Sequence, residues 1–278
     1  MDQILIVLVV YKCKFEESST FKSICAYNQL HEIHTRWLIF DNSCVDVQND
    51  YLEPDKWTKV ILQSTGRNEG LPVHYNTAFT FAEKEGIDYV LLLDQDSIFT
   101  EGLAPYYQAL SEQKEAIIVP RLITGNRMLS PSKYLLGRGF LSDNIIPGRY
   151  SLKNYSPLNS GSLIQTKIWR KAGGFNNDIK LDFSDYSFYA RVRKMQADEF
   201  LVLDYDVTHE LSSFEKDSLK IINRFSIYMD DMMAFSKEIT GINRLLLFFW
   251  AGVHFMNVLI RTRFNKNVIS IYFSKLVK

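Results

Sequence analysis

The feature that most constrains this chain is an unbroken apolar run, Tyr89 to Leu93, that ends at two carboxylates, Asp94 and Asp96, spaced one residue apart. A run of this length is typical of a strand buried on both faces of a mainly parallel sheet. Open α/β sheets bind ligands at the carboxyl ends of such strands. Side chains two residues apart on a strand point the same way, so Asp94 and Asp96 can share a divalent cation, or a cation and a ribose. A capped strand end before a turn would place the same residues there.

Composition limits the classes of protein to consider. With 278 residues and 46% hydrophobic content, the chain can form one large α/β domain or a domain with a helical appendage. Lys plus Arg equal Asp plus Glu at 32 each, which argues against a dedicated nucleic-acid binder. The three cysteines have no metal-binding or redox spacing, which favours a reducing compartment. The first apolar run follows an acidic residue and precedes no cleavage site, so it is read as a strand, not a signal peptide.

Strand and helix patterns alternate along the first half of the chain. Strands are predicted at 4–11, 37–40, 60–63 and 89–93, with helices at 15–30 and 73–84. This alternation predicts βαβ units and a mainly parallel, Rossmann-like sheet through about residue 125. Further strands are expected at 116–120, 162–165 and 201–203, with loop or short edge strands from 125 to 157. A helical pattern starts at Ile168, breaks at Gly173 and Gly174, and resumes near Asp185.

The C-terminal segment, residues 216–278, is predicted to be helical. Residues 218–236 form an amphipathic pattern, and no acidic residue follows Ile242. The apolar run from Leu245 to Ile260 has 16 residues, fewer than the ~20 that cross a bilayer. A basic, aromatic-rich helix can lie in the headgroup region of an anionic membrane, and it can equally pack on the core or in a dimer interface. Six basic residues flank the run: Arg244, Arg261, Arg263, Lys266, Lys275 and Lys278.

Two segments upstream of Asp94 suit nucleotide binding. Asp41 follows the predicted strand at 37–40, where its carboxylate could accept hydrogen bonds from a base or ribose. The run GRNEG places Arg67 and Asn68 between Gly66 and Gly70 before a helix, a layout suited to close approach of a nucleotide and its phosphates. It matches neither a Walker loop nor a G-x-G-x-x-G fingerprint, and glycine and asparagine are also common in ordinary turns.

Two further candidates lie downstream. In GGFNNDIKLDFSDYSFYAR, Asp185 opens a helix, where a carboxylate is either an N-cap or a general base for an acceptor hydroxyl. His209 follows the strand-like run LVLDYDV and is either a metal or phosphate ligand or a structural histidine.

In this order the motifs resemble those of the family 2 glycosyltransferases, nucleotide-sugar-dependent enzymes with the GT-A fold. The resemblance covers about residues 4–215 and is strongest to bacterial rhamnosyltransferase-like members, through the phrases VLLLDQDS, NSGSLI and GGFNNDIKLDFSDYSFYAR. It implies a GT-A domain at 1–215, with a nucleotide-sugar-binding half at 1–125 and an acceptor-binding half at 126–215. The helical segment 216–278 would then contact a membrane surface or a second subunit.

The resemblance also implies residue roles. The stretch from Val9 through Tyr11 to Lys12 would contact the nucleotide, together with Asp41 and Arg67. Asp94 and Asp96 would form an Asp-x-Asp motif that holds Mg²⁺ or Mn²⁺ on the diphosphate, with His209 near the metal. Asp185 would be the catalytic base.

Three positions depart from the family pattern. Lys12 stands where the family often has Asn, and Ser187 stands where an acidic residue often follows the base. Asn176 and Asn177 replace a commonly acidic pair. These departures bear on donor identity and on the support of the base more than on the reaction.

The resulting hypothesis is an inverting, metal-dependent glycosyltransferase of bacterial surface polysaccharide synthesis. It would pass a deoxyhexose such as rhamnose from a dTDP donor to a glycan or lipid-linked acceptor at the cytoplasmic face of the membrane. Three alternatives remain. The donor could be a UDP-hexose or a galactofuranose nucleotide. The chain could be a nucleotidyltransferase, although YKCKFEES lacks the glycines typical after the first strand of that class. It could also be a noncatalytic membrane-associated scaffold.

Overall fold

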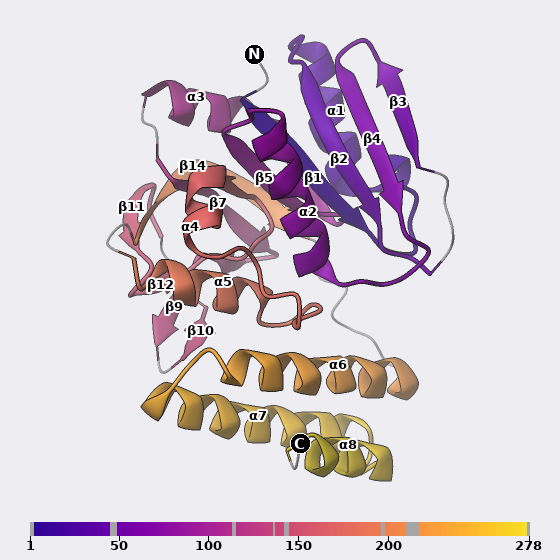
Figure 1. The fold of residues 1–278 in the computed structure, drawn as a ribbon, viewed down its shortest axis with the longest axis vertical. Helices are drawn as coiled ribbons and strands as arrows, with labels where there is room; N and C mark the ends of the chain where they lie inside the picture. The colour runs from indigo at the N-terminus through magenta and orange to yellow at the C-terminus, as the bar shows by residue number, and fades with distance from the viewer. Residues whose placement is uncertain are drawn as a thin grey trace.

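The computed structural model describes residues 3–44, 49–112, 115–135, 137–141, 145–195, 198–209 and 217–276. A central sheet has the strand order β11-β14-β7-β13-β5-β1-β2-β4-β3, and helices cover both of its faces (Figure 1). Six of these strands run parallel: β1 (Ile4–Val10), β2 (Thr35–Asp41), β4 (Thr58–Ser64), β5 (Tyr89–Asp94), β7 (Ile117–Thr124) and β14 (Glu199–His209).

The remaining strands are antiparallel to their neighbours. β13 (Ser162–Gln165) lies between β5 and β7, while β3 (Asp50–Asp55) and β11 (Gly148–Ser151) form the two edges. β6 (Ser97–Ile98) pairs with β14, and β8 (Arg127–Ser130) pairs with β7. A small separate sheet contains β9 (Ser132–Leu135), β10 (Arg138–Phe140) and β12 (Tyr155–Ser156).

Strand alternation divides the interior into two cores. Alternate side chains of β1 enter opposite cores because successive strand residues point to opposite faces. Leu5 and Val7 pack in the core that contains Phe79 of α2 (Leu71–Lys84), together with α4 (Thr166–Lys171) and α5 (Ser184–Val192). Ile6 and Leu8 pack on the other side, which is covered by the short 3-10 helix η1 (Phe15–Glu17), α1 (Ser19–Leu30) and α3 (Ala104–Glu112).

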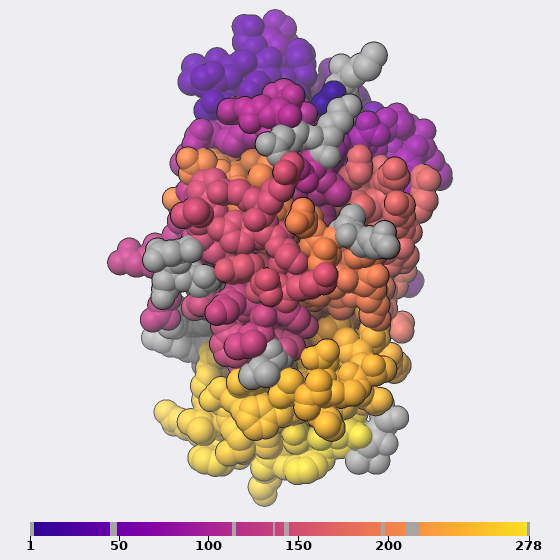
Figure 2. Space-filling model, turned by 90° about the vertical axis from the view of Figure 1, so that its left-hand side faces the viewer, coloured from indigo at the N-terminus to yellow at the C-terminus, as the bar shows by residue number. Residues whose placement is uncertain are grey.

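Three C-terminal helices form a third core: α6 (Ser218–Ser236), α7 (Gly241–Arg261) and α8 (Lys266–Leu276). Figures 1 and 2 show these helices, in orange to yellow, at one end of the molecule. Ile179, from the loop before α5, is fully buried in this core and so joins the C-terminal helices to the sheet-containing part of the chain. Among the described residues, α7 is the helix that is long and apolar enough to cross a membrane, judged by length and composition alone. It has 21 residues, more than the 16-residue apolar run, because it extends beyond that run at both ends.

The predicted α/β class with a mainly parallel sheet flanked by helices is confirmed. The seven predicted strands and the helix at 218–236 are present, with shifted ends in most cases. β3 was not predicted, because its residues include Pro54 and three acidic side chains and carry little apolar signal. The strand predicted at 201–203 extends over 11 residues, since solvent-facing carboxylates alternate with buried residues in its second half. The irregular stretch from 125 to 157 contains β8 to β12, short strands of the kind expected at an edge.

Gly70 lies at a close contact between α2 and the loop before α5. It precedes α2 with a φ of 88° and a ψ of 161°, a conformation open almost only to glycine. A Cβ at this position would lie 2.8 Å from the backbone of Lys180, and the next N–H, that of Leu71, donates to the Lys180 carbonyl at 2.8 Å. The close approach that the structure shows at Gly70 is therefore to protein backbone.

We expect Gly70→Ala to lower the free energy of unfolding by about 3 kcal/mol or more, because it adds a backbone clash to the strained dihedral. Gly86→Ala, just past the other end of α2, is the matched control. Gly86 also has a positive φ, 71°, but open space surrounds its would-be Cβ, so about 1 kcal/mol is expected. Urea denaturation of both variants checks this, and equal losses would contradict the role given to the contact with Lys180.

Candidate active site

The turn after β5 carries Asp94 and Asp96 and is fixed through the residue between them. Gln95 Oε1 accepts the Tyr11 N–H at 2.7 Å, and Gln95 Nε2 donates to the Tyr11 carbonyl at 3.4 Å. On the other side, Thr20 of α1 accepts the Ser97 N–H at 2.9 Å. The ends of β1 and β5 and the start of α1 therefore hold the two carboxylates in place.

Asp94, Asp96 and His209 form a cluster at the carboxyl edge of the sheet. One ligand atom from each lies within 4.8 Å of the others, and all three side chains are half-buried. His209 Nδ1 is 3.7 Å from Asp96 Oδ1 and 2.9 Å from Ser97 Oγ. Burial, with the negative charge of Asp96, raises the pKa of Asp94 to about 6. Two carboxylates and an imidazole therefore converge at one point of the sheet edge.

This donor set fits a divalent cation of the Mg²⁺ or Mn²⁺ type. Carboxylate oxygens suit both ions, and an imidazole ligand favours the softer Mn²⁺. The three residues come from segments that are far apart in the sequence, at the ends of β5 and β14. For this reason the sequence could suggest the cluster but could not establish it.

The ends of the neighbouring strands provide the rest of this edge. Val9 pairs with Asp94, and Val10 with Asp41. Val9 is buried, so only its backbone faces the site, whereas the Tyr11 side chain is 42% exposed. The Asp41 carboxylate accepts the Ser43 N–H at 2.8 Å, and Ser43 Oγ accepts the Lys12 N–H at 2.7 Å. Asp41 is thus placed on the same edge as Asp94.

Asn42 organises the predicted nucleotide loop. Its Oδ1 accepts the Glu69 N–H at 3.0 Å and lies 2.9 Å from His74 Nε2, while its Nδ2 donates to Asn68 Oδ1 at 3.1 Å. Burial lowers the pKa of His74 to about 4, so this imidazole is neutral at physiological pH. The Arg67 side chain, by contrast, is exposed. Asn42 and His74 are functional candidates that the sequence reasoning did not single out, although the polar run DNS after β2 contained the signal.

The segment NSGS, residues 159–162, connects the Asp94, Asp96 and His209 cluster to α5. Ser160 Oγ accepts the Asp94 N–H at 3.3 Å, the Gly161 N–H donates to the Leu92 carbonyl at 2.7 Å, and Asn159 Nδ2 donates to Ser184 Oγ at 3.0 Å. Ser184 is the first residue of α5, so the segment sets the position of α5 against β5.

Asp185 lies in the first turn of α5, where its Oδ1 accepts the N–H of Tyr186 at 2.8 Å. Burial raises its pKa to about 6, with Asp182 and Asp94 adding to the effect. Asp185 makes no N-cap: Phe183 holds that position, without a side-chain cap bond. Of the two alternatives, the structure therefore does not show the N-cap, and the catalytic role of Asp185 stays a prediction.

Tyr75 of α2 is the candidate that sequence reasoning missed entirely. Its side chain is fully buried, and burial together with the charges of Asp94 and Asp185 raises its pKa well above the ordinary value. Within the described part of the chain, its hydroxyl has no hydrogen-bond partner. A buried phenol whose pKa is raised by the charges of both carboxylates is a candidate contact for a bound ligand, but a tyrosine within an amphipathic helix gives no such signal in sequence.

A buried carboxylate holds the loop before Asp185, residues 175–183 (the base loop). Asp231 of α6 is fully buried and accepts the backbone N–H groups of Lys180, Leu181 and Asp182 at 2.8, 2.9 and 2.8 Å. Lys180 is also the residue against which Gly70 packs. The base loop is therefore fixed between the start of α2 and the middle of α6.

Glu238, just after α6, supplies a carboxylate where two of the family departures occur. It accepts hydrogen bonds from Ser187 Oγ at 2.9 and 3.0 Å and from Asn176 Nδ2 at 2.5 Å, and it lies 3.5 Å from Arg191 Nη1. Ser187 and Asn176 stand where the family often has acidic residues. In this chain the acidic group at that place comes from the C-terminal segment.

We expect Asp231→Ala to lower the free energy of unfolding by at least about 3 kcal/mol, because it leaves three backbone N–H groups without their acceptor. The neighbouring Asp230→Ala is the control. Asp230 is exposed and pairs with Lys275, so its loss should cost about 1 kcal/mol or less. Chemical denaturation gives both values, and near-equal losses would show that the three N–H groups find other partners.

Comparisons with known proteins bear on the fold. No protein-family model matches the chain, and no curated protein sequence does. The structure is similar to TarS residues 1–349 from S. aureus, with 15% identity over 86% of this chain and 65% of that one, at a TM-score of 0.51. The same protein in complex with UDP gives 14% identity, 92% and 72% coverage and a TM-score of 0.53. A longer TarS structure gives 13% identity, 95% and 55% coverage and a TM-score of 0.52.

The chain thus spans about two thirds of the shorter TarS structure and 55% of the longer one. The likeness establishes the fold, and it agrees with the predicted GT-A architecture: a mostly parallel central sheet flanked by helices, with an apolar C-terminal helix.

Proposed function

We propose that this protein is an inverting, metal-dependent glycosyltransferase that uses a nucleotide-sugar donor. The observation that carries the proposal is the pairing of two acidic sites at one sheet edge. The Asp94, Asp96 and His209 cluster lies there, and Asp185 is close enough that the charge of Asp94 raises its pKa. TarS, which has a structure with UDP bound and another with UDP-GlcNAc bound, shares the fold.

The cluster would hold the donor diphosphate through a divalent cation. A cation bound by Asp94, Asp96 and His209 neutralises the charge that develops on the leaving diphosphate. Tyr11, Asp41 and the loop containing Arg67, Asn68 and Gly70 would contact the nucleotide along the adjacent strand ends. The exposed Arg67 side chain can reach a bound phosphate, whereas Gly70 serves to seat the base loop.

Asp185 would act as the general base. A carboxylate with a pKa of about 6 is ionised at neutral pH yet more basic than an ordinary aspartate, so it can take the proton of an acceptor hydroxyl. Attack from the Asp185 side, in line with departure of the diphosphate, inverts the anomeric carbon and needs no covalent intermediate.

For the donor we propose dTDP-rhamnose, supported by the resemblance to rhamnosyltransferase-like sequences. A UDP-sugar is the second candidate, favoured by the structure of TarS with UDP-GlcNAc. The pathway would be synthesis of an O-antigen or capsule in the cytoplasm, at the inner face of the cell membrane.

A lipid-linked acceptor fits the exposed face of α7. One stripe of this helix exposes Ile242, Leu245, Phe249, Val253, Met256 and Ile260, each by 37% or more, at helical spacing. Because the segment after Ile242 is basic and has no acidic residue, we propose an anionic membrane surface as its partner. A homo-oligomer that covers the same stripe is the competing outcome.

We expect calorimetric titration to show Mn²⁺-dependent binding of dTDP or UDP, and we expect Asp96→Ala to abolish it. Asp204→Ala is the control, because Asp204 is an exposed carboxylate on the same strand as His209 and pairs with Arg121. Absence of binding by the unmodified protein to either nucleotide would remove the basis of the proposal. The nucleotide that binds more tightly identifies the donor class.

We expect Asp185→Asn to reduce turnover by ~10²-fold to 10⁴-fold while nucleotide binding persists. With the unmodified protein, the rate should rise as pH increases through about 6, because only the ionised carboxylate accepts a proton. A folded pKa above the ordinary value also means that ionised Asp185 destabilises the fold, so Asp185→Asn should unfold no earlier than the unmodified protein at pH 8. A variant that loses both turnover and stability would count against this role.

We expect the protein to float with vesicles that contain anionic lipid, and the double variant Leu245→Glu with Phe249→Glu to reduce that binding about tenfold or more. Leu30→Glu is the control, since Leu30 is an exposed leucine on α1 at 78%. If the double variant binds vesicles unchanged but becomes monomeric, the stripe is a subunit interface instead.

A further inference from the structure

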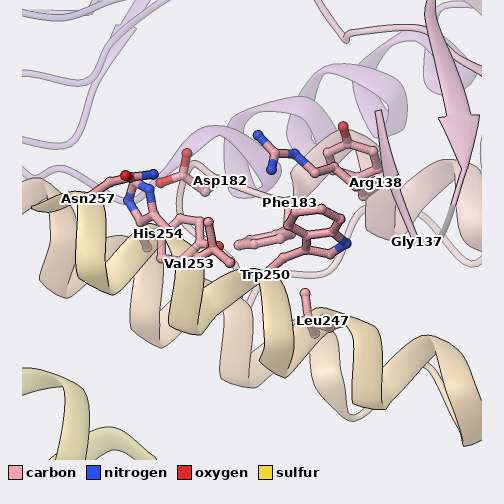
Figure 3. A pocket seen from close by; sticks show the side chains of 11 residues that line it. Gly137, Arg138, Asp182, Phe183, Leu247, Trp250, Val253, His254 and Asn257 are labelled. Carbon is pink, nitrogen blue, oxygen red and sulfur yellow. The ribbon is translucent and has the colours of Figure 1, made fainter. Parts of the chain in front are cut away.

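A cavity of about 210 Å³ lies between the base loop and the C-terminal helices. Asp182, Phe183 and Tyr186 line it together with Trp250 and Asn257 of α7. Figure 3 shows the Asp182 and Phe183 side chains near those of α7. This volume is below the roughly 300–1,000 Å³ of pockets for drug-sized ligands, and it suits a single ring-sized group.

The cavity wall combines aromatic rings with hydrogen-bonding groups. The rings of Phe183, Tyr186, Tyr228 and Trp250 face it, and the Arg138 guanidinium lies 4.9 Å from the Trp250 ring centre. Aromatic faces pack well against the C–H face of a sugar ring, and charged or amide groups beside them can bind the ring hydroxyls.

Asp182 is the carboxylate among the residues that line the cavity. Its Oδ1 accepts from Arg224 Nη2 at 2.7 Å, and its buried Oδ2 has no hydrogen-bond partner among the described residues. A buried oxygen without a partner is costly unless a ligand donates to it. An alkyl chain cannot donate, and a phosphate would meet the carboxylate as a like charge. A hydroxyl-bearing, uncharged ring satisfies both the carboxylate and the aromatic walls.

His254, which also lines the cavity, suits an uncharged, hydroxyl-bearing ring as well. Burial and the charges of Arg138, Arg261 and Arg224 lower the pKa of His254 to about 4. The imidazole is therefore neutral at physiological pH and offers both a donor and an acceptor nitrogen.

The cavity adjoins the proposed base. Asp182 and Tyr186 line it, and both flank Asp185, whose Oδ1 accepts the Tyr186 N–H. On the far side the cavity reaches Val253, which belongs to the exposed stripe of α7. The cavity is therefore lined by near neighbours of Asp185 in the sequence and by one residue of the exposed stripe of α7.

We propose that this cavity binds an uncharged sugar residue of the acceptor saccharide, stacked against Trp250 and hydrogen-bonded to Asp182. The inference rests on the proposed function and adds the place and the chemical class of the acceptor.

The test is saturation-transfer NMR of the full-length protein with a panel of methyl glycosides of rhamnose, galactose, glucose and N-acetylglucosamine. We expect saturable binding of at least one glycoside, weakened tenfold or more by Trp250→Ala and by Asp182→Asn. Phe273→Ala is the control, because Phe273 is an aromatic residue of α8 that is 57% exposed and does not line the cavity. Thermal melting identifies any variant that fails to fold, and Asp182→Asn, which keeps the shape of the side chain, then decides.

Two results would overturn the inference: no saturation transfer from any glycoside in the panel, or transfer that both variants leave unchanged. Titration with Mn²⁺ and nucleotide on the same samples separates this result from the proposed function. Glycoside binding that is lost in Trp250→Ala while nucleotide binding persists supports both. Nucleotide binding without glycoside binding refutes the cavity assignment alone, and glycoside binding without nucleotide binding refutes the proposed function alone.

Discussion

The arrangement of the candidate site depends on a carboxylate that takes no part in the chemistry. Asp231 is buried in α6, where a carboxylate loses its hydration. Hydrogen bonds from three consecutive N–H groups of the base loop offset that desolvation cost. Neither partner would be stable alone: the carboxylate would lack solvation, and the N–H groups would lack acceptors. The C-terminal helices and the base loop therefore form together, and the position of Asp185 follows from that pairing.

Electrostatics link the two acidic sites across the sheet edge. Asp94 and Asp185 both have a raised pKa near 6, each chiefly through burial, and their charges also act on each other and on the Tyr75 phenol. Such a concentration of like charge is unfavourable in the folded protein without a cation. It is the arrangement expected of a site built for ligand binding at the expense of stability.

Sequence reasoning placed the strands and the carboxylates because these depend on local pattern. An apolar run that ends at Asp94 can be read without knowing the fold, and Asp41 follows its strand in the same way. Pairing between distant segments could not be read. β13 lies antiparallel within the sheet, Glu238 reaches Ser187 from the turn after α6, and the charges of Asp94 and Asp185 act on Tyr75 in a helix whose pattern shows only burial. These features depend on tertiary packing, which one-dimensional periodicity does not encode.

Asp231 lies near the end of α6, and Glu238 lies in the turn that follows the last helical residue, Ser236. One carboxylate sets the base loop, and the other binds Ser187 on the helix that carries Asp185. Inserting one residue into α6 between Asp231 and Ser236 would turn the end of the helix, and the turn that carries Glu238, by about 100° relative to Asp231, since each residue advances the helix by that angle. The spacing along α6 is therefore as much a part of the site as the side chains, although no reacting group lies on that helix.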